Sequence, residues 1–140
     1  MQWLGVDMGG SATRWAARDA SGALVARGTA PGATGLVFDA SARAAFAAAL
    51  APARALPGLR AAYLGVTGAG FDNDPVLNAA AAGALNLPTS RVTIVNDMVL
   101  AWHAVWPRGG GHLVSAGTGS VGLGRALQTN VHLAPRATTP

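Results

Sequence analysis

The stretch that decides the fold is GVDMGGSATRWAARDASG, residues 5–22. An apolar run ends on an acid, Asp7, and is followed by two glycines and by the hydroxyl residues Ser11 and Thr13. A second β-like run, TRWAARD, then leads to Ser-Gly at residues 21–22, a pair that is typical of a hairpin turn. The stretch therefore predicts neighbouring antiparallel strands, the first two joined by a glycine-rich turn that presents backbone N–H groups and hydroxyls.

Outward from this stretch, strand and helix signals alternate along the chain. QWLGVDM, ATRWAARDA and ALVARGTA read as three consecutive strands in an antiparallel meander. Two Ala-rich helices follow, the first capped by Asp39 or Ser41 and the second by Asp74, with Pro75 at its first position. AAYLGVTGAG and RVTIVND are further strands, MVLAWHAVWP is a short helix, and HLVSAGTGSVGLGR is a strand–turn–strand segment. The order βββαβαβα plus a β-hairpin predicts an α/β fold with a mixed sheet, because single strands separated by helices pair in parallel.

The composition restricts the class of partner. The 140 residues are 51% hydrophobic, and all the charged side chains are Arg or Asp, with a formal net charge of +4. The arginines are spread singly, without the cluster or stripe that nucleic-acid binding needs. The chain has no cysteine, which excludes disulfides and thiolate metal sites, and His103, His112 and His132 lack the spacing of metal ligands. No signal peptide or membrane-spanning run is recognisable, so we expect a cytoplasmic protein that binds neither nucleic acid nor membrane.

Four polar segments that follow or interrupt strand-like runs are the candidate functional elements: Asp7–Gly10, Thr67–Gly70, Asn96–Asp97 and Gly117–Ser120. In an open α/β sheet, ligands gather at the carboxyl ends of the strands. Glycines let backbone N–H groups approach an anion, and a carboxylate holds Mg²⁺ directly or through water. The pattern therefore predicts a site for a magnesium-bound polyphosphate. A structural interpretation also stays open, because hairpins with Gly are common and Asp97 could simply cap a helix.

Three segments resemble, in the same order, motifs of the actin-like ATPase superfamily, which includes sugar kinases. GVDMGGSATRW resembles the first phosphate motif, VTIVNDMVLAW the segment that holds the catalytic carboxylate of sugar kinases, and LVSAGTGSVGLGR the second phosphate motif. Within the superfamily, SAGTGS and its flanks look most like the BadF/BadG/BcrA/BcrD-type ATPase family, whose best-known kinases act on N-acetylglucosamine. The resemblance covers residues 2–125.

The resemblance also implies how the chain is divided. A ribonuclease-H-like lobe is expected over residues 1–110, and a second phosphate hairpin at 111–125 is expected to begin a C-terminal lobe. The tail at residues 126–140, ALQTNVHLAPRATTP, matches no segment of that second lobe. We therefore expect a truncation or a shifted reading frame after about Arg125. The 140-residue chain alone is then expected to have little kinase activity, and the full-length protein could form a homodimer.

The resemblance assigns roles to individual residues in ATP-dependent phosphorylation of a sugar or amino sugar. Asp7 matches the acid that supports Mg²⁺, through water, and Asp97 matches the carboxylate that accepts the proton of the sugar hydroxyl. Asn96 is expected to help hold the sugar. Thr34 lies where kinases of this type often carry an Asn that contacts the sugar, so the identity of the sugar stays open. The phosphates of ATP are expected to contact two loops: Gly9, Gly10, Ser11 and Thr13 in the first, and Gly117, Thr118, Gly119 and Ser120 in the second.

Three alternatives belong beside this hypothesis. ATPases of the same family that activate acyl-CoA dehydratases or reductases carry a Cys just before the second phosphate loop, where this chain has Ser115 and Ala116 and contains no Cys at all. A non-catalytic nucleotide- or sugar-binding remnant would keep the fold without phosphoryl transfer. A cytoskeletal actin-like ATPase would need polymer contacts that the sequence does not reveal.

The remaining motifs are expected to be structural. FDNDP at residues 71–75 lacks the glycine and the glutamate of a calcium loop, so we interpret it as a turn and helix cap. Trp102 and Trp106 are i,i+4 neighbours on one helix, which favours core packing. Trp3 and Trp15 are expected to pack on faces of the sheet, and His103 is expected at the surface.

Overall fold

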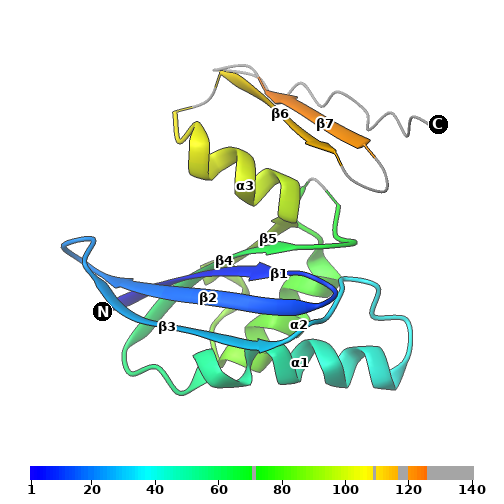
Figure 1. Cartoon of the computed structure of the whole chain (residues 1–140). Coiled ribbons are helices and arrows are strands. Elements are labelled where there is room, and N and C mark those ends of the chain that lie inside the picture. The colour runs from blue at the N-terminus through cyan, green and yellow to red at the C-terminus, as the bar shows by residue number, and fades with distance from the viewer. Residues whose placement is uncertain (71, 109, 117–119, 126–140) are drawn as a thin grey trace. The chain divides into compact units, whose positions relative to one another are not determined.

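The computed structural model describes residues 1–70, 72–108, 110–116 and 120–125 (Figure 1). The element order confirms the pattern predicted from the sequence, with a short 3₁₀ helix (η1) that was not expected. The strands and helices are β1 (Gln2–Met8), β2 (Ala12–Asp19), β3 (Leu24–Pro31), α1 (Ala40–Arg54), β4 (Leu59–Val66), α2 (Pro75–Leu85), η1 (Thr89–Arg91), β5 (Val92–Asn96), α3 (Asp97–Val105), β6 (Gly111–Ala116) and β7 (Ser120–Arg125).

The first five strands form one mixed sheet in the order β3-β2-β1-β4-β5. The strands β1, β2 and β3 pair antiparallel, as the meander predicted, whereas β4 and β5 pair parallel to β1 and to each other. The crossovers through α1 and α2 impose this parallel pairing, because each helix returns the chain to the starting edge of the sheet. The predicted mixed α/β fold is therefore confirmed.

The chain divides into two compact units, Met1–Asp97 and Met98–Pro140. The first unit contains the five-stranded sheet with α1 and α2. The described part of the second unit contains most of α3 and the antiparallel hairpin of β6 and β7. The domain boundary expected after residue 110 stays a prediction.

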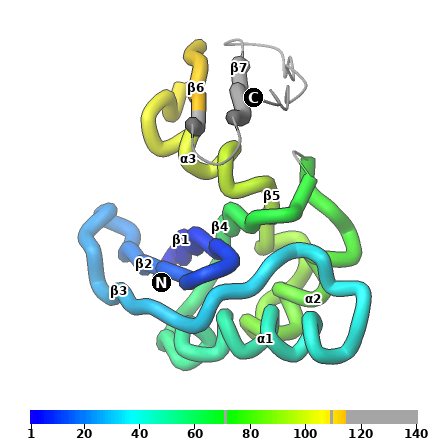
Figure 2. The backbone as a smooth tube through the Cα atoms, turned by 45° about the vertical axis from the view of Figure 1, so that its right-hand side comes forward, coloured from blue at the N-terminus to red at the C-terminus, as the bar shows by residue number. Residues whose placement is uncertain are grey.

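The hydrophobic core of the first unit lies between one face of the sheet and the helices α1 and α2. On β1, Leu4, Val6 and Met8 are buried, and the residues between them are exposed. The two helices lie side by side on this buried face (Figures 1 and 2). Four residues of α1 are buried in the core, two of them alanines: Phe46, Ala49, Leu50 and Ala53. The small alanine side chains let the helix approach its neighbours closely, which explains the Ala-rich sequence.

The predicted helix caps are confirmed. The Asp39 carboxylate accepts a hydrogen bond from the N–H of Ala42 at 2.7 Å, at the start of α1. The Asp74 carboxylate accepts from the N–H groups of Val76 at 2.8 Å and Leu77 at 3.2 Å, with Pro75 at the first position of α2. These bonds satisfy N–H groups that have no partner inside the helix. FDNDP therefore ends in a helix cap, as expected.

The tryptophans divide between buried and exposed positions. Trp15 packs against the core and lies opposite Gly28 in the pairing of β2 with β3, where a side chain at position 28 would collide with the indole ring. Trp102 is buried, its ring centroid lies 6.1 Å from that of Trp106, and its indole N–H donates to the Gly111 carbonyl at 2.9 Å. The expected packing of Trp15 on a face of the sheet and the expected core position of Trp102 are confirmed, whereas Trp106 is only half-buried. Trp3, in contrast, is 42% exposed, because it alternates with the core residues of β1 and lies on the other face.

The turn between β2 and β3 is organised by the carboxylate of Asp19. It accepts hydrogen bonds from the Ser21 hydroxyl at 2.6 Å, the Ser21 N–H at 2.9 Å and the Ala23 N–H at 3.1 Å. The Ser21 hydroxyl, with smaller contributions from these backbone N–H groups, holds the pKa of Asp19 below its ordinary value. The charged side chain thus acts as the acceptor that closes the turn.

This lowered pKa predicts a local dependence on pH. Because the folded state binds the proton of Asp19 less tightly than the unfolded chain, the stabilisation is present above about pH 4 and is lost as the pH falls through the folded pKa. We expect the amide signals of Ser21 and Ala23 to shift with the titration of Asp19 in NMR spectra recorded on acidification. In the Asp19→Asn variant these shifts should vanish. Shifts of the same size in the variant would contradict the assignment.

Within the described ranges, no helix is both long enough and apolar enough to cross a membrane.

Candidate functional site

The carboxyl ends of the parallel strands β1, β4 and β5 lie along one edge of the sheet. Asp7 pairs in register with Gly65, and Gly65 pairs with Val95. One residue further, Met8, Val66 and Asn96 form the next row. Neighbouring strands lie about 4.8 Å apart, so the backbones at Asp7 and Val95 are separated by about 10 Å. Three of the four polar segments singled out in the sequence therefore meet at this edge.

Asp7 is exposed on the face of the sheet that α1 and α2 do not cover. Its neighbours Val6 and Met8 point into the core, so the alternation of the strand turns the Asp7 carboxylate the opposite way. Arg14 lies directly opposite Asp7 in the β1–β2 pairing and is also exposed. Arg14 was not among the expected site residues. Its position could have been found by pairing the two strands across the glycine turn, because residue numbers that sum to 21 face one another.

The turn after β1 is built from Gly9, Gly10 and Ser11. The Gly9 N–H donates to the Ala12 carbonyl at 3.0 Å, and this hydrogen bond closes the turn. Gly10 and Ser11 form the tip of the turn. Gly10 and Ser11 are exposed, and a Cβ atom built on Gly10 would meet no heavy atom within 4 Å. The tip therefore has room for an anion beside backbone N–H groups and the Ser11 hydroxyl.

Thr13 lies outside this turn. It is the second residue of β2, its side chain is completely buried, and its hydroxyl donates to the Pro31 carbonyl at 3.0 Å. The hydroxyl thus holds β2 to the end of β3. The sequence suggested a phosphate contact here, but the placement in the core assigns Thr13 a structural bond, and we leave it out of the proposed phosphate contacts.

Thr34 is held between the turn after β1 and the loop after β4. The preceding residue, Ala33, donates its N–H to the Gly9 carbonyl at 3.1 Å, and the following residue, Gly35, donates to the Thr67 carbonyl at 2.9 Å. The Thr34 hydroxyl accepts a hydrogen bond from the N–H of Leu36 at 3.3 Å. These bonds place Thr34 on the same edge as the other candidate residues.

Asn96 ends β5 and is anchored to the loop that follows β4. Its backbone N–H donates to the Gly70 carbonyl at 2.8 Å, and its side-chain amide donates to the Ala69 carbonyl at 2.9 Å. Asp97 is the next residue and the first of α3. A carboxylate in the first turn of a helix is favourable in itself, so the structural interpretation of Asp97 is compatible with this position. Asp97 is nevertheless only half-buried, two residues beyond the row of Asp7.

The second phosphate loop lies largely outside the described residues. Gly117, Thr118 and Gly119 are not among them, and Ser120 is described only as the first residue of β7, paired with Ala116.

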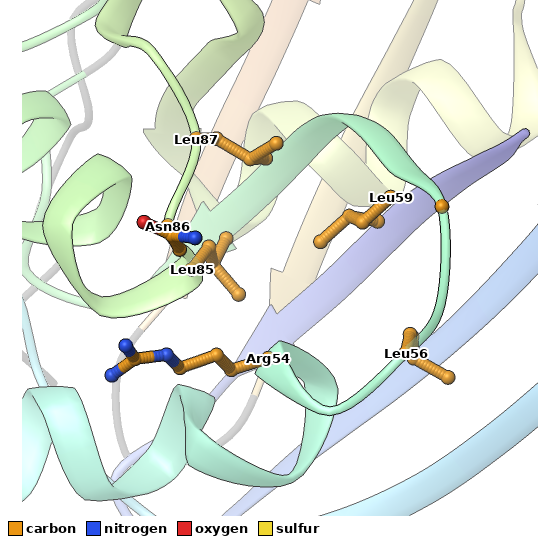
Figure 3. A pocket seen from close by; sticks show the side chains of 7 residues that line it. Arg54, Leu56, Leu59, Leu85, Asn86 and Leu87 are labelled. Carbon is orange, nitrogen blue, oxygen red and sulfur yellow. The ribbon is translucent and has the colours of Figure 1, made fainter.

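A hollow of about 240 Å³ lies at the opposite end of β4 from the candidate site (Figure 3). It is lined by the carboxyl-terminal ends of α1 and α2 and by the beginning of β4, including Arg54, Leu59 and Leu87. Leucine side chains line it together with the polar side chains of Arg54 and Asn86, and none of the candidate residues contributes to it.

Comparison of the sequence with protein-family models and with curated proteins finds no match. Solved structures do share the fold. One is a protein from Porphyromonas gingivalis that carries the provisional name N-acetylglucosamine kinase, with a TM-score of 0.70 and 22% identity over 97% of this chain and 47% of that one. Another is a ROK family glucokinase from Streptomyces griseus in complex with glucose and AMPPNP, with a TM-score of 0.64 and 20% identity over 98% of this chain and 47% of that one.

A third structure of the same fold is a ROK family transcriptional regulator, a homolog of the E. coli MLC protein. Its TM-score is 0.59 and its identity 17%, over 96% of this chain and 40% of the other. The chain thus spans about half the length of these structures. At such low identities the likeness establishes the fold alone, a mixed α/β fold that the chain shares with part of each of these structures.

Proposed function

We propose that this chain is the phosphate-binding lobe of an ATP-dependent sugar or amino-sugar kinase. The observation that carries the proposal is the convergence of Asp7, the Gly9–Ser11 turn and Asn96–Asp97 at the carboxyl ends of three parallel strands. This edge is where ligands bind in open α/β sheets. The sugar-kinase names of two structural neighbours agree with the proposal. The finer assignment, to the BadF/BadG/BcrA/BcrD-type family and to N-acetylglucosamine, rests on the sequence motifs.

The residues of the first turn fit a magnesium-bound triphosphate. Gly10 and Ser11 are exposed beside open space, so their N–H groups and the Ser11 hydroxyl would bind phosphate oxygens. Asp7 is an exposed carboxylate two residues before the turn and would hold Mg²⁺ through water. Arg14, opposite Asp7, adds a positive charge that would favour the anion. When bound, ATP would supply the phosphoryl group, and Mg²⁺ would neutralise the negative charge of the phosphates.

Asp97 and Asn96 would act on the sugar. In the proposed reaction the Asp97 carboxylate accepts the proton of the attacking hydroxyl, whose oxygen forms a bond to the γ-phosphorus as the bond to ADP breaks. The side-chain amide of Asn96 donates a hydrogen bond to the Ala69 carbonyl, which fixes the orientation of the Asn96 side chain. Thr34 would contribute a polar group from the neighbouring loop. Gly117–Ser120 would form the second phosphate loop.

A second candidate function is binding of a sugar or nucleotide without phosphoryl transfer. One structural neighbour is a transcriptional regulator rather than a kinase, so the same fold serves both purposes. Activation of an acyl-CoA dehydratase or reductase is disfavoured because the chain has no cysteine for an iron–sulfur cluster. We further propose that the protein is cytoplasmic and that its full-length form is a homodimer.

The proposal predicts metal-dependent nucleotide binding at the first turn. In NMR titrations of the 140-residue chain, we expect Mg·AMPPNP to shift the amide signals of Gly9, Gly10 and Ser11 saturably at millimolar concentrations. The Asp7→Asn variant should lose the effect of Mg²⁺, because it removes the carboxylate that orders the metal's water. Asp19→Asn, at the other end of β2, is the matched control and should bind as the wild type does.

The same preparation tests turnover. We expect a coupled assay to detect little sugar-dependent ADP from the 140-residue chain, because kinases of this kind close two lobes around the nucleotide to exclude water. Turnover at an ordinary kinase rate of about 1–100 s⁻¹ would contradict this expectation. An absence of saturable shifts at the turn would overturn the nucleotide site itself.

A further inference from the structure

β5 lies at the edge of the five-stranded sheet, so within the described part of the chain no strand pairs with the outer side of its backbone. Alternate residues of an edge strand turn their N–H and C=O groups outward. In β5 these residues are Val92, Ile94 and Asn96. The free N–H and C=O groups of such an edge normally form hydrogen bonds with water or with a strand of another chain. Here, polar groups of the same chain occupy it instead.

Two asparagines, Asn73 and Asn78, form hydrogen bonds with the backbone of this edge. The Asn73 side-chain oxygen accepts a hydrogen bond from the Ile94 N–H at 2.9 Å. The Asn78 side-chain amide donates to the Val92 carbonyl and also to the Asn73 oxygen, the latter at 3.2 Å. Asn78 is 4% exposed and belongs to α2, whereas Asn73 precedes that helix. The two side chains thus connect the start of α2 to β5, and we call them the amide pair.

The amide pair continues the contacts that hold Asn96. Two residues beyond Ile94, the Asn96 N–H and side-chain amide donate to the carbonyls of Gly70 and Ala69, in the loop after β4. All three outward-facing residues of β5 therefore have a partner on the segment between β4 and α2 or on α2 itself. These bonds set the position of the end of the strand, from which Asp97 follows directly.

We infer that Asn73 and Asn78 are positioning residues, which hold the outer edge of β5 and thereby fix the location of Asn96 and Asp97. The inference rests on the proposed function, since it is through Asn96 and Asp97 that the amide pair would affect the reaction. Neither asparagine needs to touch a substrate. Asn78 is buried and Asn73 is exposed, and the hydrogen bonds that join them to β5 suit this task because each bond restricts the orientation of the next.

The directions of the hydrogen bonds make the inference specific. Asn73 acts only as an acceptor in these two bonds, so an aspartate at position 73 can replace it. Asn78 acts only as a donor, so leucine, of similar size, removes both of its bonds without leaving a cavity. Thr93→Ala is the matched control, because Thr93 lies on the same strand with an exposed side chain outside the amide pair.

The experiment is amide hydrogen exchange by NMR on the 140-residue chain, together with the titration with Mg·AMPPNP and N-acetylglucosamine. We expect Asn73→Ala to increase the exchange rates of Ile94 and Asn96 by roughly tenfold, the effect of losing about one hydrogen bond. Asn73→Asp should restore the wild-type rates, Asn78→Leu should resemble Asn73→Ala, and Thr93→Ala should change neither amide. Unchanged exchange in Asn73→Ala, or no restoration by Asn73→Asp, would overturn the inference.

The titration separates the inference from the function on which it rests. If the amide pair positions the site, ligand-induced shifts at Asn96 and Asp97 should weaken in Asn73→Ala and return in Asn73→Asp. Shifts that remain equal in all variants would overturn the positioning role. If the wild type responds to neither ligand while the exchange rates follow the expected pattern, the proposed function fails. The conclusion that the amide pair holds the edge of β5 is then still supported.

Discussion

Replacing Asp97 by Asn is expected to reduce phosphoryl transfer by about 10²–10⁴-fold while leaving the binding of nucleotide and sugar intact. Asparagine has the same shape as aspartate but cannot accept a proton at neutral pH, so the variant removes the proposed base and little else. The measurement is a comparison of kcat with the dissociation constants of both substrates, in a two-lobe protein that contains this lobe. A fall in kcat without weaker binding would support the assignment of Asp97.

The control for this prediction is Asp39→Asn. Asp39 caps α1 through one hydrogen bond to Ala42, and asparagine caps a helix about as well as aspartate does. The control should therefore keep full activity. Thermal unfolding of both variants as 140-residue chains would show that Asp97→Asn leaves the fold intact. If transfer is unchanged in Asp97→Asn, the residue is only the beginning of α3 and takes no part in the chemistry.

Replacing Gly32 by Ala is expected to lower the free energy of unfolding by about 1–3 kcal/mol, the usual range for forcing an additional carbon into a packed place. A Cβ atom at position 32 would collide with the backbone carbonyls of Gly9 and Gly10. These are backbone atoms, so the collision can be relieved only by separating the two loops, which the hydrogen bond from Ala33 to Gly9 opposes. Urea unfolding measures the change in stability.

The Gly32→Ala change should also weaken nucleotide binding, because the displaced backbone belongs to the turn that is proposed to bind phosphate. Gly83→Ala is the control. Gly83 lies within α2, and a Cβ there would meet no heavy atom within 4 Å, so this variant should be about 0.5–1 kcal/mol more stable than the wild type. A Gly32→Ala protein as stable as the wild type would contradict the close approach of the two loops.

Local chemistry made most of the fold predictable from the sequence. Asp74 followed by Pro75 before an Ala-rich run marks the start of a helix, because the carboxylate binds N–H groups only two and three residues away. The turn at Gly9 and Gly10 and the hairpin at Asp19 are decided by neighbours in the chain in the same way. Even the common edge of Asp7, Thr67 and Asn96 follows from counting strands and crossovers.

Contacts between distant residues were not predictable in this way. Thr13 follows a glycine turn and has the appearance of a phosphate ligand, yet its hydroxyl bonds Pro31, 18 residues away, inside the core. In the sequence, Asn73 belongs to a segment that we interpreted as a turn. Only the tertiary fold brings its side chain to the N–H of Ile94, 21 residues further along the chain. Arg14 became a neighbour of Asp7 through the register of two strands.

The sequence by itself therefore determined the order of helices and strands, their caps and the edge at which the polar residues gather. These depend on hydrogen bonds within a few residues and on the alternation of apolar side chains. Only the tertiary structure decided which of the polar side chains face outward and which hold the scaffold together. That distinction depends on which backbone groups the assembled sheet leaves without a partner, and a carbonyl such as that of Pro31 or an N–H such as that of Ile94 acquires its partner only when the sheet has formed.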